Sequence, residues 1–413
     1  MKRILVLLCL TFTLAIMSSC EKELSTPASS KSATQLHRLS GNEEVKDEIV
    51  LANGNSVLVG NKLDDAFIVM FNPQNEIVWE REIAKSGTDA FFTVAELPNG
   101  DILTAGHTNS REYSTDRLST DILLVKYSAN GNELMDIVFG TEYDDKPNDI
   151  MVDKNGDILI VGNVNNHIIR SYAYKLRPDG KLIWKKQYQF GPYFNEAKAI
   201  CALDNGNYLI GGIQSKSTLL FEIRKTHTFT FSLDGNGDVQ SYYPYQAYTR
   251  SDLMIREWAP MDLIKTPSGY LLCSFYYDES HAEAPCAQFL ELAANYSVSN
   301  EKRLYGIGSL KPFKLYPQAN GYLLTGASST EKTITLYGFS RALGSVMKLN
   351  DKLEIEWSTF TGSEGLLQES YTAKITGDKL NVQGNSINLF NNNANLFSYF
   401  LHPTNGELIN EAK

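Results

Sequence analysis

The chain has 413 residues, of which 43% are hydrophobic, 11% aromatic and 21% charged. This balance is ordinary for a globular protein and excludes wholesale disorder and fibrous repeats. The 38 Lys and Arg against 48 Asp and Glu give a net charge of −10 without long runs of one sign, which argues against nucleic acid as a partner. Length alone suggests two or three domains, although an all-β fold can hold this many residues in one.

Residues 1–19 have the pattern of an export signal. Lys2 and Arg3 precede an apolar run that ends at Ile16, and small residues lead from there to Cys20. As a helix this run rises about 20 Å, too short for a bilayer core of about 30 Å. The segment resembles a bacterial lipoprotein signal, which implies that Cys20 becomes the lipid-bearing first residue. The alternative is an ordinary secretory signal with a chance cysteine.

The residues around Cys20 bear on where such a lipoprotein resides. Met17 replaces the usual Leu three positions before the cysteine, and the charged segment 21–23 follows without an Asp. Such a segment resembles those of surface-exported lipoproteins and implies an outer-membrane protein that faces outward. Acyl chains contribute about 0.8 kcal/mol per buried CH₂ to anchoring. Residues 20–35, rich in Ser, Thr, Ala and Pro, are predicted to be the lipidated cysteine and a flexible tether.

Three cysteines remain beyond the signal and the lipidation position: Cys201, Cys273 and Cys286. They form no CxxC motif. Cys201 and Cys273 lie in apolar strand patterns, so we expect small buried side chains. A Cys273–Cys286 disulfide is the alternative in an oxidising compartment.

An internal repeat organises most of the chain. Its motif is an apolar run, a tight turn with Gly, a second apolar run and usually another Gly, as in residues 50–60 and 155–162. Asn-Gly between apolar runs is the strongest short hairpin signal, because both residues tolerate positive φ. The turn glycines recur 46, 56, 50, 63, 52 and 56 residues apart. They are Gly54, Gly100, Gly156, Gly206, Gly269, Gly321 and Gly377.

Each copy carries a second hairpin further along the chain, for example between residues 67–71 and 76–80. Four strands in each of seven copies, with no credible long helix, predict an all-β fold. The expected architecture is a seven-bladed β-propeller with four-stranded antiparallel blades. Residues 36–413 are predicted to form this single domain.

One segment carries a family resemblance. Residues 179–184 (Asp-Gly-Lys-Leu-Ile-Trp) resemble the blades of quinoprotein-like propellers, and the repeat is similar to those of bacterial propeller lipoproteins. The resemblance covers residues 47–413 and concerns architecture. It implies a tryptophan-docking motif that holds the ring. Trp79, Trp184 and Trp357 occupy the same repeat position in three copies, and the other four copies lack it.

A propeller must close its ring, because an open edge strand invites aggregation. The last copy ends weakly near residues 406–411, whereas residues 36–41 match the end of an outer strand such as residues 303–306. We therefore expect residues near 34–40 to pair into the seventh blade.

Short turns and long loops are expected on opposite faces of the propeller. With strands a to d numbered from the axis outward, the a–b and c–d turns share one face, and the b–c and d–a loops share the other. We call the second face the loop face. Long irregular segments usually carry binding residues. Those on the loop face are residues 110–120, 141–148, 215–225, 247–260, 331–343 and 363–370.

The d–a loop of the fourth copy is the leading candidate for binding on the loop face. It accounts for the longest spacing and contains Tyr248, Arg250, Arg256 and Trp258. The repeat explains the other tryptophans but not Trp258, and Trp beside Arg is typical of a contact hot spot or of a platform that stacks on a sugar. The alternative is a plug that covers the propeller axis. Secondary candidates on the same face are Tyr143, Tyr193 and Arg341.

Motifs for catalysis, metals and cofactors are absent. The six histidines are scattered without HxH, HExxH or HxxE spacing, which predicts no metal site. Without a GxSxG, P-loop or GxGxxG motif, we assign no cofactor and no catalytic residue. A carboxylate pair for glycoside hydrolysis, assembled from different blades, is the alternative. The acidic residues expected on the loop face are Asp144, Asp145, Glu196, Asp252, Glu257, Glu364 and Glu369.

Anchor, fold and loop face together favour a surface-exposed, non-catalytic binding module for a glycan, a peptide or another envelope protein. By analogy of location and fold, it would be an accessory subunit of an outer-membrane nutrient-uptake complex. Its expected neighbours are the membrane, through the lipid, and a TonB-dependent transporter or SusD-like lipoprotein. The alternatives are a hydrolase or lyase that acts on polysaccharide, and a scaffold in envelope assembly.

Overall fold

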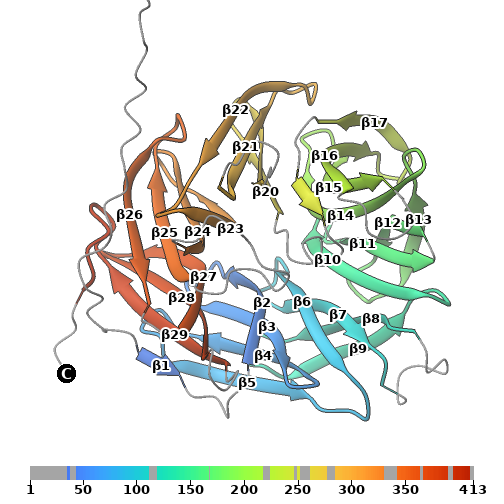
Figure 1. The fold of residues 1–413 in the computed structure, drawn as a ribbon. Coiled ribbons are helices and arrows are strands. Elements are labelled where there is room, and N and C mark those ends of the chain that lie inside the picture. The colour runs from blue at the N-terminus through green and yellow to red at the C-terminus, as the bar shows by residue number, and fades with distance from the viewer. Residues whose placement is uncertain are drawn as a thin grey trace, which may run out of the picture.

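The chain forms a seven-bladed β-propeller in the computed structural model, as the repeat predicts (Figure 1). The structure describes residues 35–37, 43–110, 119–166, 168–216, 224–245, 249–251, 261–276, 284–329, 342–362, 366–388 and 394–409. Within these ranges all regular elements are strands, and no helix is long and apolar enough to cross a membrane. The strands group into seven antiparallel sheets around one axis.

The blades follow one another in chain order, and each inner strand lies next to the axis. The first three are β2–β5 (Glu43–Val50, Ser56–Lys62, Asp65–Phe71, Ile77–Ile83), β6–β9 (Asp89–Glu96, Ile102–Thr108, Asp121–Tyr127, Glu133–Phe139) and β10–β13 (Asp144–Val152, Ile158–Asn166, Ile168–Leu176, Leu182–Tyr188). The fourth is β14–β17 (Tyr193–Ala202, Tyr208–Lys216, Arg224–Leu233, Val239–Pro244), joined by β18 (Thr249–Ser251). The fifth and sixth are β19–β22 (Met261–Thr266, Gly269–Tyr276, Cys286–Leu292, Val298–Leu304) and β23–β26 (Ser309–Pro317, Tyr322–Ser329, Leu343–Leu349, Ile355–Thr361).

The seventh blade joins both ends of the described chain. It contains β27 (Leu366–Thr376), β28 (Lys379–Asn388), β29 (Ala394–Leu401) and, on its outer edge, β1 (Gln35–His37). β1 pairs antiparallel with β29, with Leu36 opposite Phe397. The predicted ring closure by residues near 34–40 is confirmed.

The Asn-Gly hairpins form as expected. In the first blade the N–H of Gly54 donates to the carbonyl of Leu51 at 3.0 Å, and the N–H of Leu51 donates to that of Asn55 at 2.8 Å. Gly54 has a φ of +98°, which a side chain would disfavour. The turns at Gly100, Gly156 and Gly206 repeat this pattern.

Three tryptophans connect neighbouring blades, as the docking motif predicts. The indole N–H of Trp79 in β5 donates to the carbonyl of Ala129, in the outer turn of the next blade, at 3.0 Å. Trp184 and Trp357 make the corresponding bonds at 2.9 Å and 3.1 Å. A turn glycine with positive φ lies against each indole, as Gly131 does against Trp79. Each such junction therefore combines an apolar ring with a hydrogen bond to the next blade.

A bulge recurs in the inner strands of six blades. It is at Lys46, Phe92, Asn148, Lys198, Phe313 and Tyr371, where the pairing register with the second strand shifts. A glycine of the second strand lies opposite each bulge, and a Cβ there would stand between 1.7 and 2.4 Å from an inner-strand carbonyl oxygen. These are the second glycines of the repeat motif. They admit the close approach that creates the bulge.

Cys201, Cys273 and Cys286 form no disulfide with one another. Cys273 lies opposite Phe289 in the β20–β21 pairing, and Cys286 lies opposite Tyr276. Cys273 and Cys286 are buried, and Cys201 is partly buried. The alternative of a Cys273–Cys286 disulfide is thus contradicted, and these thiols act as small apolar side chains.

Candidate functional site

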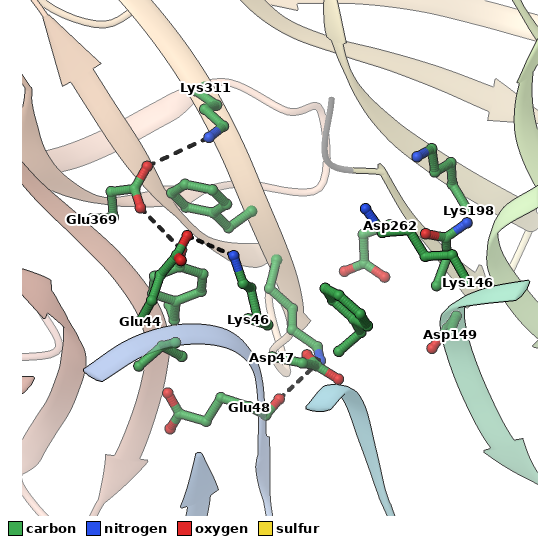
Figure 2. A pocket seen from close by; sticks show the side chains of 16 residues that line it. Glu44, Lys46, Asp47, Glu48, Lys146, Asp149, Lys198, Asp262, Lys311 and Glu369 are labelled. Atoms are coloured by element: carbon green, nitrogen blue, oxygen red, sulfur yellow. Dashed lines mark hydrogen bonds and ion pairs between the residues drawn. The ribbon is translucent and has the colours of Figure 1, made fainter. Parts of the chain in front are cut away.

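The inner strands of all seven blades enclose a cavity of about 330 Å³ on the propeller axis. Charged side chains dominate its wall, and they enter from different blades (Figure 2). The lining residues are Glu44, Val45, Lys46, Asp47, Glu48, Phe92, Lys146, Asn148, Asp149, Lys198, Asp262, Lys311, Phe313, Lys314, Glu369 and Tyr371.

The cavity lies toward the loop face. Each inner strand begins at a d–a loop and ends at the a–b turn, so its N-terminal end marks the loop face. The lining residues are in the N-terminal part of these strands, for example residues 44–48 of β2 and residues 146–149 of β10. The sequence predicted this face for binding, but from its loops.

Two layers of side chains can be distinguished from the strand register. Asp47, Asp149, Asp262 and Lys314 follow the bulge position or its equivalent and lie deeper; we call them the channel floor. The channel collar is nearer the loop face and consists of the other charged and aromatic lining side chains except Glu48. These are Glu44, Lys46, Phe92, Lys146, Lys198, Lys311, Phe313, Glu369 and Tyr371.

The floor aspartates connect neighbouring blades. A carboxylate oxygen of Asp47 accepts from the N–H of Val94 in the second blade at 3.0 Å. Asp149 accepts in the same way from Ile200 in the fourth blade at 2.8 Å. Asp262 of the fifth blade accepts from the N–H of Leu315 in the sixth blade, also at 2.8 Å. One part of their role is therefore structural.

Lys314 takes the place of an aspartate in the sixth blade and lies among these carboxylates. Its ammonium donates to Asp47 and to the carbonyl of Glu48, both at 2.8 Å. Burial alone would lower its pKa, but Asp47 and Asp262 outweigh burial and raise the pKa of Lys314 above its usual value. Lys314 is therefore charged at neutral pH.

Asp149 and Asp262 have no such partner. Among the described residues, neither carboxylate has a lysine or arginine nitrogen within 4.0 Å. Burial, reinforced by Asp47, raises the pKa of Asp149 to about 7, against the opposing hydrogen bond from Ile200. Burial also raises the pKa of Asp262, against the attraction of Lys314. The floor therefore holds carboxyl groups that lack a full complement of cations.

Glu48 is a further carboxyl group on the cavity wall. Its side chain is 1% exposed, and neither carboxyl oxygen has a hydrogen-bond partner among the described residues. Burial raises the pKa of this carboxyl group well above the usual value, against the attraction of Lys314. Such an unsatisfied buried acid is uncommon in a native protein.

The collar combines ion pairs with aromatic rings. Lys311 lies 3.4 Å from Glu369, whose other oxygen accepts from the Tyr371 hydroxyl at 3.0 Å. The rings of Phe313 and Tyr371 stack with centroids 4.6 Å apart. Lys146 lies 5.0 Å from the centre of the Phe92 ring. These groups present donors, acceptors and apolar surface to the same small space.

Two further ion pairs belong to the collar. Lys46 pairs with Glu44 on the same strand, and Lys198 pairs with Glu196 at 3.0 Å. Glu196 does not line the cavity. Within the described part of the chain, no three His, Cys, Asp or Glu side chains are placed to hold a metal ion.

The leading binding candidates from the sequence are outside the described residues, except for one stretch of backbone. Cys20, Tyr248, Arg256, Trp258 and Arg341 fall in the ranges that are not described. Arg250 is in β18, where its backbone pairs with that of Lys225. Their role in binding stays a prediction.

The other predicted loop-face residues are placed away from the cavity. Tyr143 is half-buried and packs against the core between the second and third blades. Tyr193 begins β14 opposite Lys216. Neither lines the cavity. The structure does not bring these two tyrosines together with the floor or the collar.

Of the predicted loop-face carboxylates, Glu369 alone lines the cavity among those described. Asp144 accepts from the N–H of Thr120, and Asp145 accepts from Thr141. Asp252, Glu257 and Glu364 fall outside the described residues. A group of these carboxylates at one catalytic centre is not seen.

Sequence reasoning missed the floor. Asp47 and Asp149 each precede the second glycine of their repeat, Gly60 and Gly162, by 13 residues. Aligning the first strand of every copy on this glycine would have placed the two aspartates at one level of the ring. The long loops differ from the repeat pattern and therefore stand out in the sequence, whereas the floor residues lie within the pattern.

Comparison with known proteins supports the fold and goes no further. No known protein family matches the sequence, and no curated protein matches it. Synechocystis apocarotenoid oxygenase is similar in structure, with 10% identity, 89% of this chain and 90% of that chain covered, and a TM-score of 0.50. An ancestral GH74 enzyme has 10% identity, 85% and 47% coverage, and a TM-score of 0.50. The β-propeller domain of the Trilobed protease from Pyrococcus furiosus has 8% identity, 86% and 95% coverage, and a TM-score of 0.46.

Proposed function

We propose that the protein is a lipid-anchored, non-catalytic binding module of the outer membrane that captures a glycan or a peptide at the loop-face end of its central channel. The observation that carries this proposal is the cavity on the axis, which all seven blades line. Its floor and collar supply polar groups from different blades, and aromatic side chains supply apolar contact. Convergent polar groups beside aromatic side chains are a feature of small-molecule sites.

The size of the cavity limits what it can hold. About 330 Å³ is at the lower end of the range for ligand pockets, roughly 300–1,000 Å³. A small molecule or the end of a chain fits such a space, whereas a folded domain does not. The site is therefore proposed to take one end of its ligand, and the loop-face segment 247–260 is proposed to contact the part of the ligand that remains outside.

The anchor is proposed from the sequence, and the closed ring fits it. β1 begins at Gln35, so a tether of about 15 residues joins the lipidated Cys20 to the seventh blade. A flexible chain of this length spans roughly 20 Å. The propeller would remain close to the membrane, within reach of a TonB-dependent transporter or a SusD-like lipoprotein.

A second candidate function, hydrolysis of a polysaccharide, has one observation in its favour. Asp149 borders the cavity with a pKa of about 7, which suits a general acid or base at neutral pH. The likeness to an ancestral GH74 enzyme at 10% identity is one of fold. We favour binding because both oxygens of Asp149 are engaged by backbone N–H groups, of Ile150 and Ile200.

The test is to fill the cavity and measure capture. Arrays of oligosaccharides and peptides are probed with the wild-type protein and with Lys46→Trp, which places an indole in the collar. We expect capture to fall at least about tenfold. Lys181→Trp, on an exposed turn, is the matched control and should bind normally. If Lys46→Trp captures as much ligand as the wild-type protein, the binding site is not in the channel. If shortened glycans are released, the hydrolase is favoured.

A further inference from the structure

The cavity has charges of opposite sign at its two ends. The floor has three aspartates and one lysine, whereas the collar lining has four lysines and two glutamates. The floor is thus acidic and the collar basic among the described lining residues. This separation follows from the register, because Lys146 and Lys311 precede Asp149 and Lys314 on the same strands by three residues.

The acidic end has one cation, Lys314, for its three aspartates. Lys314 pairs with Asp47, and no described lysine or arginine nitrogen lies within 4.0 Å of Asp149 or Asp262. Glu48 lines the same cavity with both carboxyl oxygens unpartnered and its side chain 1% exposed. Buried carboxylates are stabilised by a neighbouring cation. A ligand ammonium group should therefore interact more favourably with the floor than with the rest of the cavity.

The basic end is suited to an anion. Lys46, Lys146, Lys198 and Lys311 enter the collar from the first, third, fourth and sixth blades. Glu44 and Glu369 are the collar carboxylates that line the cavity, and they pair with Lys46 and Lys311. A ligand carboxylate that reaches the collar can accept from ammonium groups on more than one blade. Charge-assisted hydrogen bonds of this kind are about twice as strong as neutral ones.

The two ends are separated by the length of a short peptide. Three residues of a strand rise about 10 Å, and a bulge shortens this distance somewhat. An extended peptide spans about 3.3–3.6 Å per residue. Two or three peptide residues therefore place an ammonium group at the floor and a carboxylate at the collar. Phe92 of the collar lines the same cavity and offers an apolar contact.

We propose that the cavity binds a short zwitterionic peptide of two or three residues, with its ammonium group between Asp149 and Asp262 and its carboxylate at Lys146 and Lys311. This inference rests on the proposed function and selects a peptide over a glycan. An uncharged saccharide forms hydrogen bonds with the same side chains but supplies no cation to the floor. The zwitterion compensates both ends at once.

Proton release is a consequence of this arrangement. The charged groups that face Asp149 are Asp47, Asp262 and Lys314, with Lys146 and Lys198 on the surrounding wall. A peptide ammonium at the floor favours the ionised form of Asp149, so affinity rises as the pH increases through about 7. The peptide's own ammonium loses its proton above about pH 8, and affinity then falls. Binding should be tightest between these values.

The test is calorimetric titration of the full-length wild-type protein with trialanine, N-acetyl-trialanine, trialanine amide and maltotriose. We expect trialanine to bind, either capped form to bind at least about tenfold more weakly, and maltotriose not to bind. If N-acetyl-trialanine binds as tightly as trialanine, the inference is wrong. If maltotriose binds and Lys46→Trp abolishes this, the proposed function stands and the peptide inference falls. If all four probes fail to bind, both fail.

Two variants separate the ends of the site without relying on stability. Asp262→Asn should weaken trialanine and leave N-acetyl-trialanine unchanged, because the capped peptide has no ammonium group. Lys146→Met should weaken trialanine and leave trialanine amide unchanged. Loss of folding would weaken every probe alike, and an equal loss for all probes in both variants would overturn the proposal. Asp101→Asn, on an exposed turn, is the control.

Discussion

Lys314 of the sixth blade pairs with Asp47 of the first blade at 2.8 Å, across the inner edge of the seventh. The inner strands of both blades, β23 and β2, contact β27 of the closing blade. The closing blade is therefore bounded on its outer edge by β1 and on the axis by this ion pair. Both contacts join residues that are far apart in the sequence: Leu36 with Phe397, and Asp47 with Lys314.

Replacing Lys314 with Met should destabilise the propeller. The substitution leaves Asp47 without its cation and removes the attraction that opposes the raised pKa of Asp262. We expect a loss of roughly 2 kcal/mol in the free energy of unfolding at pH 7, less than for a fully buried pair because the Lys314 side chain is 33% exposed. Urea unfolding measures this loss. The exposed Lys181→Met is the control, and an unchanged midpoint for Lys314→Met would contradict the structural role.

Stability should fall as the pH rises from about 4 to 7. Asp149 has a pKa of about 7 in the folded protein, above its ordinary value of 3.8. The folded state then binds more protons than the unfolded state between these values, so protonation stabilises it by up to about 4 kcal/mol and this is lost on raising the pH. Asp149→Asn should flatten the dependence in urea unfolding at several pH values. If the free energy of unfolding of Asp149→Asn changes with pH as steeply as that of the wild-type protein, other groups cause the dependence.

The glycine opposite each bulge should tolerate no side chain. A Cβ on Gly162 would stand 2.1 Å from the carbonyl oxygen of Lys146. Gly162→Ala should therefore destabilise the third blade by about 2–4 kcal/mol, measured by thermal unfolding. Gly235→Ala is the matched control, because a Cβ there meets nothing within 4 Å. Equal melting temperatures for the two variants would contradict the steric explanation of the bulge.

Removing β1 should open the ring. A chain that starts at residue 43 lacks the strand that pairs with β29, and the edge of the seventh blade is then exposed. We expect a lower melting temperature and more self-association in solution. Deleting only residues 21–34 keeps β1 and should change neither property. If both deletions behave alike, the pairing of Gln35–His37 contributes nothing to closure.

Trp258→Ala tests the loop-face segment. Trp258 precedes Asp262 by four positions, so the covalent chain keeps their Cα atoms within about 15 Å of each other. If Trp258 is a binding residue, the Trp258→Ala variant should capture less ligand or partner. Its melting temperature should be nearly that of the wild-type protein. A large drop in melting temperature would instead support the plug. Capture on solubilised outer membranes and thermal unfolding are the two measurements.

Some predictions succeeded because their signal is local. The Asn-Gly turns, the alternation of apolar residues and the position of Trp79 in its repeat depend on neighbours within a few residues. Ring closure was also predictable, since a propeller edge must be paired and the segment after the tether resembles an outer strand. Of the two possibilities for the cysteines, the expected buried thiols of Cys273 and Cys286 are observed and the alternative disulfide is not, because two cysteines in adjacent strands bond only if their side chains meet.

The sequence by itself determined the repeat, the number of blades, the closing strand and the face with the long loops. The tertiary structure alone decided which side chains share the axis. Asp47, Asp149, Asp262 and Lys314 come from four different repeats, and no pattern within one repeat shows that they line the same cavity. The effect of these charges depends on their being close together, because burial and repulsion by Asp47 and Asp262 raise the pKa of Asp149 once the ring has closed.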